Sequence, residues 1–366
     1  MLLTLASLMS TDWILKQPFW LAFALVLLAC NSLLFSDLNA SVPGTLVLFA
    51  GLGATYWLGK KFFGRETLFY FLLVFSASLL LPLVVQKPVG DPWVWLCLVL
   101  TVLASLAWLK QPRWYWRLGA WAAFSAALFL QPLEALLTIM PLALFWRFRH
   151  PNGRQLDGLY LWIAGPLIAA GVWWWQREQP GGPDFLWSWS SPQWPSLFGI
   201  QWLAMLPWLG FLAAGLVEII RNQSKGEEWS VLMGGIVLGA MSGNTLFLQW
   251  AFALIIAKQL QRFFMPGYPY GNLVKTLTLL HLMAWLLLGI LGLIYSYSEW
   301  GAQGFRTGMI LILAYWIPGF FGAIGMYGKD HRLMSLGLAF SALLFSLATR
   351  VRSGPWLEKV LNELPF

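Results

Sequence analysis

Charged residues are scarce in this chain. Asp, Glu, Lys and Arg together make up only 10% of the 366 residues, whereas hydrophobic residues make up 59%. A water-soluble domain cannot reach this balance, because most of its surface would have to be apolar. The composition excludes a soluble globular protein and predicts a polytopic membrane protein.

Cysteine is almost absent as well. Cys30 and Cys97 both lie in apolar runs without metal-ligand spacing, so we expect neither a structural disulfide nor a zinc site. The chain shows no internal repeat and no soluble domain at either end. The apolar stretch Met1–Met9 lacks the basic segment and the small-residue cleavage site of a signal peptide, so no cleaved leader is expected.

Histidine occurs only three times, at distant positions. His150 and His331 lie beside basic residues between apolar runs, where solvation explains them. His281 lies inside an apolar run, where a polar side chain needs a partner. Either a hydrogen bond to a neighbouring helix or a functional role would supply that partner.

Long apolar runs fill most of the chain. Lipid offers the backbone no hydrogen bonds, so each crossing segment must be a helix of roughly 20 residues or a strand of a closed barrel. The runs are continuous, which favours helices. We therefore expect an all-α transmembrane bundle of about 12 or 13 spans, forming one domain over residues 1–366. Twelve spans are predicted at 42–59, 68–85, 92–109, 116–131, 133–146, 159–175, 202–220, 231–243, 245–257, 274–295, 307–326 and 333–349.

The run 18–35 either crosses the membrane or lies in its interface, and residues 350–366 form a short tail.

In the span 231–243, Gly234, Gly235 and Gly239 have the spacing of close helix packing.

The distribution of basic residues predicts the orientation. Lys and Arg are retained on the cytoplasmic side of membrane proteins. With the turn 60–65 placed inside, the cytoplasmic turns hold Lys60, Lys61, Arg65, Lys110, Arg113, Arg117, Arg147, Arg149, Arg154, Arg221, Lys225, Lys258, Arg262, Lys275, Lys329 and Arg332. The outer turns hold the basic residues Lys87, Arg177 and Arg306 and the acidic residues Asp37, Asp91, Glu134, Glu178, Asp184 and Glu299. The tail from Arg350 falls outside and carries three basic residues, against this trend.

The longest outer loop, 176–201, is rich in Trp, Pro, Ser and Gly. Long loops in compact folds carry function more often than structure. An outward-facing cavity would lie here, beside Asp91 and Glu134. Tryptophans near the span ends, among them Trp93, Trp95, Trp114, Trp174, Trp187 and Trp189, are expected in the aromatic belt at the membrane surface. The cluster from Trp187 to Trp194 alternatively forms a stacking surface for a sugar ring.

Individual outer residues have alternative interpretations. Asp91 precedes Pro92 and is either a helix N-cap or a carboxylate facing a donor sugar or a metal. Glu134, just after Pro132, is either solvated or part of the site. Arg177 either binds a phosphate or pairs with an acidic residue of its own loop.

Five passages carry a resemblance to a known family. They are TDWILKQPFW at 11–20, SVPGTLVLFAGLGATYWLGKKFFGRETL at 41–68, VGDPWVWLCLVL at 89–100, WQREQPGGPDFLWSW at 175–189 and WLAMLPWLGFLAAGLVEIIRNQ at 202–223. In this order they resemble the GT-C superfamily of membrane glycosyltransferases, particularly bacterial lipid A aminoarabinose transferases and their dolichyl-phosphate-mannose relatives. The resemblance covers nearly the whole chain.

The resemblance implies a donor, an acceptor and a location. The donor would be a sugar linked to a polyprenyl phosphate, and the acceptor a lipid on the outer face of the bacterial inner membrane. It implies Asp91 or Glu134 as the catalytic base, and Arg177, Glu178, Trp187 and Trp189 as substrate-binding residues. It implies membrane lipids as partners, and a membrane protein is the partner in the scaffold alternative. The charge distribution and the residue spacing predict no nucleic-acid partner and no metal.

The chain departs from the family pattern at three places. Family members place an acidic pair after their first spanning helix, where a carboxylate can accept a proton. Nothing similar precedes Asp12, so we expect that helix and that pair to be missing. Two family turns that present a lysine to the lipid phosphate correspond to Leu130–Gln131–Pro132 and Asn244–Thr245–Leu246, which contain no cation.

Two functions therefore stay open. The preserved order of segments favours a glycosyltransferase, and the lost charged groups favour a non-catalytic relative, a pseudoenzyme that serves as a scaffold or subunit of a membrane complex. A transporter is less attractive, because the acidic residues fall in loops or near span ends rather than near the bilayer midplane.

Overall fold

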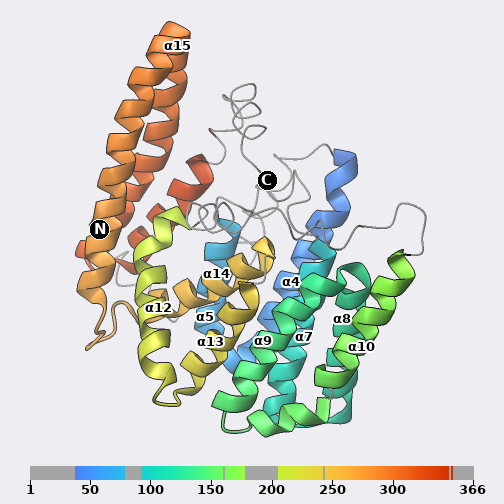
Figure 1. The fold of residues 1–366 in the computed structure, drawn as a ribbon. Helices are drawn as coiled ribbons and strands as arrows, with labels where there is room; N and C mark the ends of the chain where they lie inside the picture. Colours follow the sequence, from blue (N-terminus) through green and yellow to red (C-terminus); the bar gives the residue numbers. More distant parts are fainter. Residues whose placement is uncertain are drawn as a thin grey trace.

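The computed structural model describes residues 38–78, 92–159, 161–177, 205–241, 244–345 and 348. Every regular element within these ranges is helical (Figure 1). The elements are α4 (Leu38–Phe63), α5 (Arg65–Ser76), α7 (Pro92–Lys110), α8 (Trp114–Leu130), α9 (Pro132–Arg149), the 3-10 helix η1 (Gly153–Leu159), α10 (Leu161–Arg177), the 3-10 helix η2 (Leu206–Trp208), α12 (Leu209–Gln223), α13 (Glu228–Ala240), α14 (Thr245–Arg262), α15 (Gly271–Tyr327) and the helix His331–Phe345.

The all-α fold class is confirmed. Each of the twelve predicted spans overlaps one of these helices, with 274–295 and 307–326 falling in the two halves of α15. The run 18–35 and the tail 350–366 lie outside the described residues. The crossing of every helix, and a single domain over the whole chain, stay predictions.

Three of the described helices are long and apolar enough to cross a membrane: Pro92–Lys110, Gly271–Ser298 and Gly301–Tyr327. They differ in their surroundings. In α7, 67% of the most apolar window is buried inside the protein, against 17% and 33% in the two halves of α15. Helix α7 therefore belongs to the interior of the bundle, whereas α15 presents its apolar side chains to the surroundings.

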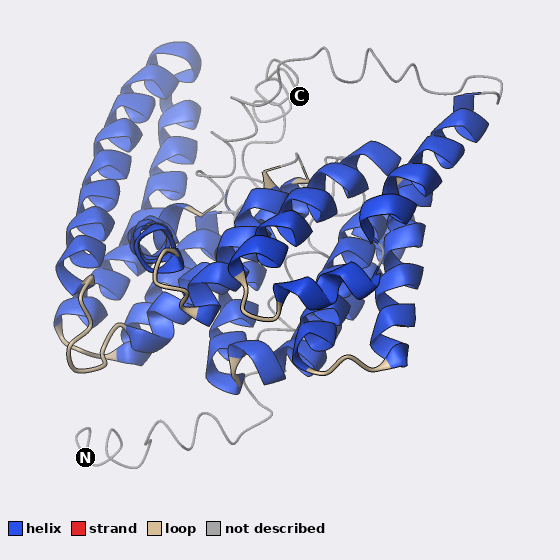
Figure 2. Cartoon of the chain, turned by 60° about the horizontal axis from the view of Figure 1, so that its bottom comes forward, coloured by secondary structure: helices blue, strands red, loops and turns tan. Residues whose placement is uncertain are grey.

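Helix α15 is a helical hairpin. At Gly301 the backbone has φ 59° and ψ −143°, a conformation that side-chain-bearing residues rarely adopt, and the chain reverses there. Figure 2 shows the two halves standing side by side at one edge of the molecule. The hairpin packs against α12, where a Cβ atom on Gly210 would lie 2.6 Å from the carbonyl oxygen of Val274.

The predicted glycine packing is present in α13. Trp146 of α9 is fully buried and donates its indole N–H to the carbonyl oxygen of Leu232 at 3.0 Å. A Cβ atom on Gly235 would overlap this indole ring, and one on Gly239 would overlap the backbone of Thr138. The glycines thus let α9 and α13 approach closely, as small residues do between membrane helices.

The tryptophans divide between surface and core. Trp93, Trp114 and Trp174 are exposed near helix ends, as expected of an aromatic belt. Trp95, which the sequence places in the same belt, is fully buried and stacks on Phe75 at a centroid distance of 5.8 Å. Its belt assignment was wrong, because α7 lies inside the bundle rather than at its perimeter.

Successive helices run in alternate directions, so the bundle has two ends. One end, the lower in Figure 1, carries the turns α4–α5, α7–α8, α9–α10 and α12–α13, and we call it the basic end because Lys and Arg gather there. The other end, called the opposite end below, carries the start of α7, the α8–α9 turn, the end of α10 and the start of α14.

Candidate active site

Two turns that are distant in the sequence meet at the opposite end of the bundle. The first joins α8 to α9 and contains Gln131, which precedes Pro132 at the first helical position of α9. The second leads into α14 and contains Asn244. A hydrogen bond from the Asn244 amide nitrogen Nδ2 to the Glu134 carboxylate oxygen Oε1 joins these turns across 110 residues of sequence.

Asn244 uses both of its side-chain polar atoms. Its Oδ1 accepts a hydrogen bond of 2.7 Å from the backbone N–H of Phe247, so Asn244 is the N-cap of α14. Its Nδ2 is then directed at Glu134. The side chain is only 1% exposed, and Leu246 and Phe247 beside it are fully buried. Asn244 is therefore a fixed, buried donor.

Glu134 lies in the first turn of α9 and is half-buried. The backbone N–H groups at a helix start carry a partial positive charge, which favours a carboxylate there. No side chain caps this helix at Gln131. The Thr138 hydroxyl donates to the carbonyl oxygen of Glu134 at 2.8 Å, one turn further along α9. The site can thus hold an ionised carboxylate near the surface of the bundle.

The other predicted site residues are only partly described. Arg177 is the last residue of α10, so its backbone lies at the same end as Glu134. Asp91, Glu178, Trp187 and Trp189 lie outside the described residues. Asp91 immediately precedes Pro92, the first residue of α7, whose start also lies at the opposite end.

An exposed aromatic pair lies at this end. Phe129, near the end of α8, stacks on Trp175, near the end of α10, with a centroid distance of 5.8 Å and an interplanar angle of 28°. Both side chains are about half exposed. The prediction of a stacking surface concerned the loop after α10 and did not include this pair.

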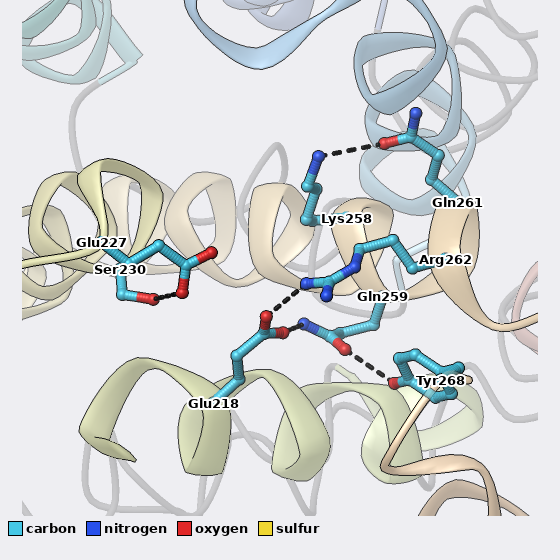
Figure 3. A network of polar contacts seen from close by, with 8 residues as sticks. All are labelled: Glu218, Glu227, Ser230, Lys258, Gln259, Gln261, Arg262 and Tyr268. Carbon is cyan, nitrogen blue, oxygen red and sulfur yellow. Dashed lines mark hydrogen bonds and ion pairs between the residues drawn. The ribbon is translucent and has the colours of Figure 1, made fainter. Parts of the chain in front are cut away.

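A second polar cluster, which the sequence did not reveal, lies at the basic end (Figure 3). Glu218 of α12 is 2% exposed and forms an ion pair with Arg262 of α14. The Gln259 amide donates to the second Glu218 oxygen at 2.5 Å, and the Tyr268 hydroxyl donates to Gln259 at 2.6 Å. Burial, followed by the negative charge of Glu218, raises the pKa of Tyr268.

This cluster continues onto α5. Gln261 donates to Glu66 at 2.9 Å and accepts hydrogen bonds from Thr67 at 2.6 Å and Lys258 at 3.3 Å. Apart from the Lys258–Gln261 bond within α14, these contacts hold α5, α12, α14 and the turn after α14 together. A charged residue within the apolar helix α12 was the sequence signal that could have pointed to such a partner.

His281 has a partner on a neighbouring segment, as one of its two interpretations required. Its Nε2 lies 2.8 Å from the hydroxyl oxygen of Tyr315, across the α15 hairpin. Ser341 of the helix His331–Phe345 donates to the carbonyl oxygen of Tyr315 at 2.6 Å. His150 follows the last residue of α9, and His331 begins the helix His331–Phe345; both lie at the basic end, where burial lowers the pKa of each imidazole.

A metal site has no candidate in the part of the chain that the structure describes, since no group of three His, Cys, Asp or Glu side chains converges there. A cleft of about 390 Å³ on the hairpin α15 is lined by apolar and aromatic side chains, including Leu279, Met283, Trp316 and Phe320. It contains no carboxylate or cation and is separate from Glu134.

Comparison with known proteins identifies the fold. A scan against protein-family models and a search of curated proteins found no match. Two crystal structures of ArnT from Cupriavidus metallidurans share the fold. The structure bound to undecaprenyl phosphate matches 92% of this chain and 67% of ArnT, at 12% sequence identity and a TM-score of 0.59.

The apo structure of the same protein matches 90% of this chain and 66% of ArnT, at 13% identity and a TM-score of 0.59. This chain therefore spans about two thirds of the length of ArnT. The resemblance to lipid A aminoarabinose transferases is confirmed at the level of the fold: the chain is an all-α, ArnT-like membrane protein.

Proposed function

We propose that this protein transfers a sugar from a polyprenyl-phosphate carrier to a lipid acceptor on the outer face of the bacterial inner membrane. The observation that carries the proposal is the Glu134 carboxylate, held by a buried amide at the opposite end of an ArnT-like bundle. This end has few basic residues, so the positive-inside rule assigns it to the outer side.

The proposed reaction needs a base and a leaving group. Glu134 accepts the proton of the acceptor oxygen as that oxygen bonds to the anomeric carbon of the sugar. The bond between that carbon and the phosphate oxygen breaks, and the polyprenyl phosphate leaves with the bonding electrons. Asp91 is the second candidate base, and both carboxylates flank the predicted outer cavity.

The remaining predicted residues take substrate-binding roles in this proposal. Arg177 binds the phosphate of the carrier through its guanidinium group, and Glu178 binds a sugar hydroxyl. Trp187 and Trp189 stack on the sugar ring. The binding of undecaprenyl phosphate by ArnT supports a polyprenyl carrier as the donor.

Turnover by the purified protein tests the proposal. The protein is reconstituted in nanodiscs and supplied with radiolabelled polyprenyl-phosphate sugars and total bacterial lipid. Loss of a general base typically lowers the rate by about 10²–10⁴-fold, which is the expected effect of Glu134→Gln. Glu228→Gln is the matched control, because Glu228 also lies in a first helical turn but is exposed at the basic end. Equal turnover by both variants would exclude Glu134 as the base.

A non-catalytic scaffold is the alternative, and one observation favours it. In the family that this chain resembles, two turns present lysines; the corresponding turns contain no cation here. In one of these turns, the amide of Asn244 is already bonded to Glu134. A scaffold would show no turnover with any donor and would co-purify in fixed stoichiometry with another membrane protein. Turnover that Glu134→Gln abolishes would exclude it.

A further inference from the structure

Asn244 is the link between the two turns of the candidate site, and its orientation is fixed from both sides. The N-cap bond requires Oδ1 to face the backbone N–H of Phe247. A carboxylate oxygen can only accept, so the group that faces Glu134 must be the amide N–H. The two bonds agree on the same orientation, and a flipped amide would break both.

We propose that Asn244 is a positioning residue for Glu134, which holds the carboxylate ionised and in place at the opposite end of the bundle. The inference rests on the proposed function, in which Glu134 is the base. A hydrogen-bond donor aimed at a carboxylate favours its charged form. The rigid N-cap means that this donor is in place before any substrate binds.

Most charged residues on the described helices packed against α9 lie far from Glu134. Among the elements packed against α9, the charged residues Lys110, Arg117, Arg154, Asp157 and Glu228 all lie at the basic end. With 18 residues, α9 separates its two ends by about 27 Å. Of the charged residues on these elements, Arg177 at the end of α10 lies at the opposite end of the bundle, as Glu134 does. Asp91 lies just before the start of α7. Within the described residues, the neutral amide of Asn244 is thus a direct partner of the carboxylate at this end.

A pair of exchanges tests the contact itself. Asn244→Asp keeps an N-cap oxygen for Phe247 but replaces the donor by a second carboxylate facing Glu134. We expect this variant to melt at a lower temperature than the wild type at pH 8, and to recover at pH 5. Adding Glu134→Gln should restore the wild-type melting temperature at pH 8, because an amide and a carboxylate then face each other in exchanged positions.

The control variant is Asn244→Ser, which also keeps the N-cap but brings neither a donor in reach of Glu134 nor a charge. Its melting temperature should lack the recovery at pH 5 that Asn244→Asp shows, because no second carboxylate faces Glu134. If Asn244→Asp and Glu134→Gln have additive effects on the melting temperature, the two side chains do not interact and the inference is overturned.

The pH profile of turnover tests the effect on the base. Asn244→Asp should shift the acidic limb of the profile to higher pH by one unit or more, because a like charge favours protonated Glu134. A merely structural role would lower the rate without moving the limb, and that result would overturn the inference. A wild-type protein without turnover would overturn the proposed function and the catalytic half of this inference, while the melting experiment would still decide the positioning half.

Discussion

The buried ion pair at the basic end gives a stability prediction whose size follows from the structure. Glu218 is 2% exposed and Arg262 is 32% exposed, and Gln259 donates to the same carboxylate. Replacing Glu218 by Leu conserves most of the volume but leaves the Arg262 guanidinium and the Gln259 amide without their acceptor. Removing one partner of a buried pair typically costs 3–5 kcal/mol.

The lower end of that range applies here, because water can still reach Arg262. We therefore expect Glu218→Leu to lower the free energy of unfolding by about 3 kcal/mol. The exposed pair Arg147–Asp157 is the matched control, with side chains 35% and 45% exposed. Its loss in Asp157→Leu should cost less than about 1 kcal/mol.

Unfolding by sodium dodecyl sulfate in mixed micelles, followed by tryptophan fluorescence, measures both values. The double variant Glu218→Leu/Arg262→Met should recover most of the loss, since an apolar pair of similar volume replaces a buried ion pair at little cost. A loss below about 1 kcal/mol in the single variant, or additive losses in the double one, would show that the pair does not hold α12 to α14.

Two further predictions concern packing and pH. Gly235→Leu should destabilise the protein by about 1–3 kcal/mol, because the leucine side chain would overlap the buried indole of Trp146. Gly53 of α4 has open space around it, so Gly53→Leu should have no effect in the same unfolding assay. Burial lowers the pKa of His331 below its ordinary value of 6.5, so the unfolded chain binds the proton more readily and stability should fall as the pH drops below 6.5. The negative charges of Glu66 and Asp330 oppose this lowering of the His331 pKa. The variant His331→Asn should flatten the pH–stability curve below pH 6.5. A steeper curve in the variant would contradict the prediction.

The sequence predicted the helices well, because a run of apolar residues is a local property. Each run from 42 to 349 overlaps a described helix, and the basic turns gather at one end. The sequence failed where the environment of a side chain mattered. Trp95 lies in the core rather than at the surface, since lipid and protein interior are equally apolar and hydropathy does not distinguish them.

The polar contacts were beyond sequence reasoning for a different reason. An Asn before an apolar run is a readable N-cap signal, so the role of Asn244 at the start of α14 was accessible. Its bond to Glu134 spans 110 residues, and the pair Glu218–Arg262 spans 44. Such contacts depend on how helices pack around one another, which no local pattern encodes.

The Asn244 contact bears directly on the choice between an enzyme and a scaffold. In the resembling family, a lysine at this turn meets the lipid phosphate, whereas here an amide holds a carboxylate. The change removes a positive charge and fixes a negative one at the same end of the bundle, so a phosphate ligand must find its cation elsewhere. Of the basic residues described at that end, Arg306 lies on the hairpin α15, which packs against α12, and Arg177 ends α10, which packs against α9. In the proposed enzyme we assign this role to Arg177, while a scaffold protein places no such demand on that residue; Lys87, which the sequence also places on the outer side, lies outside the described residues.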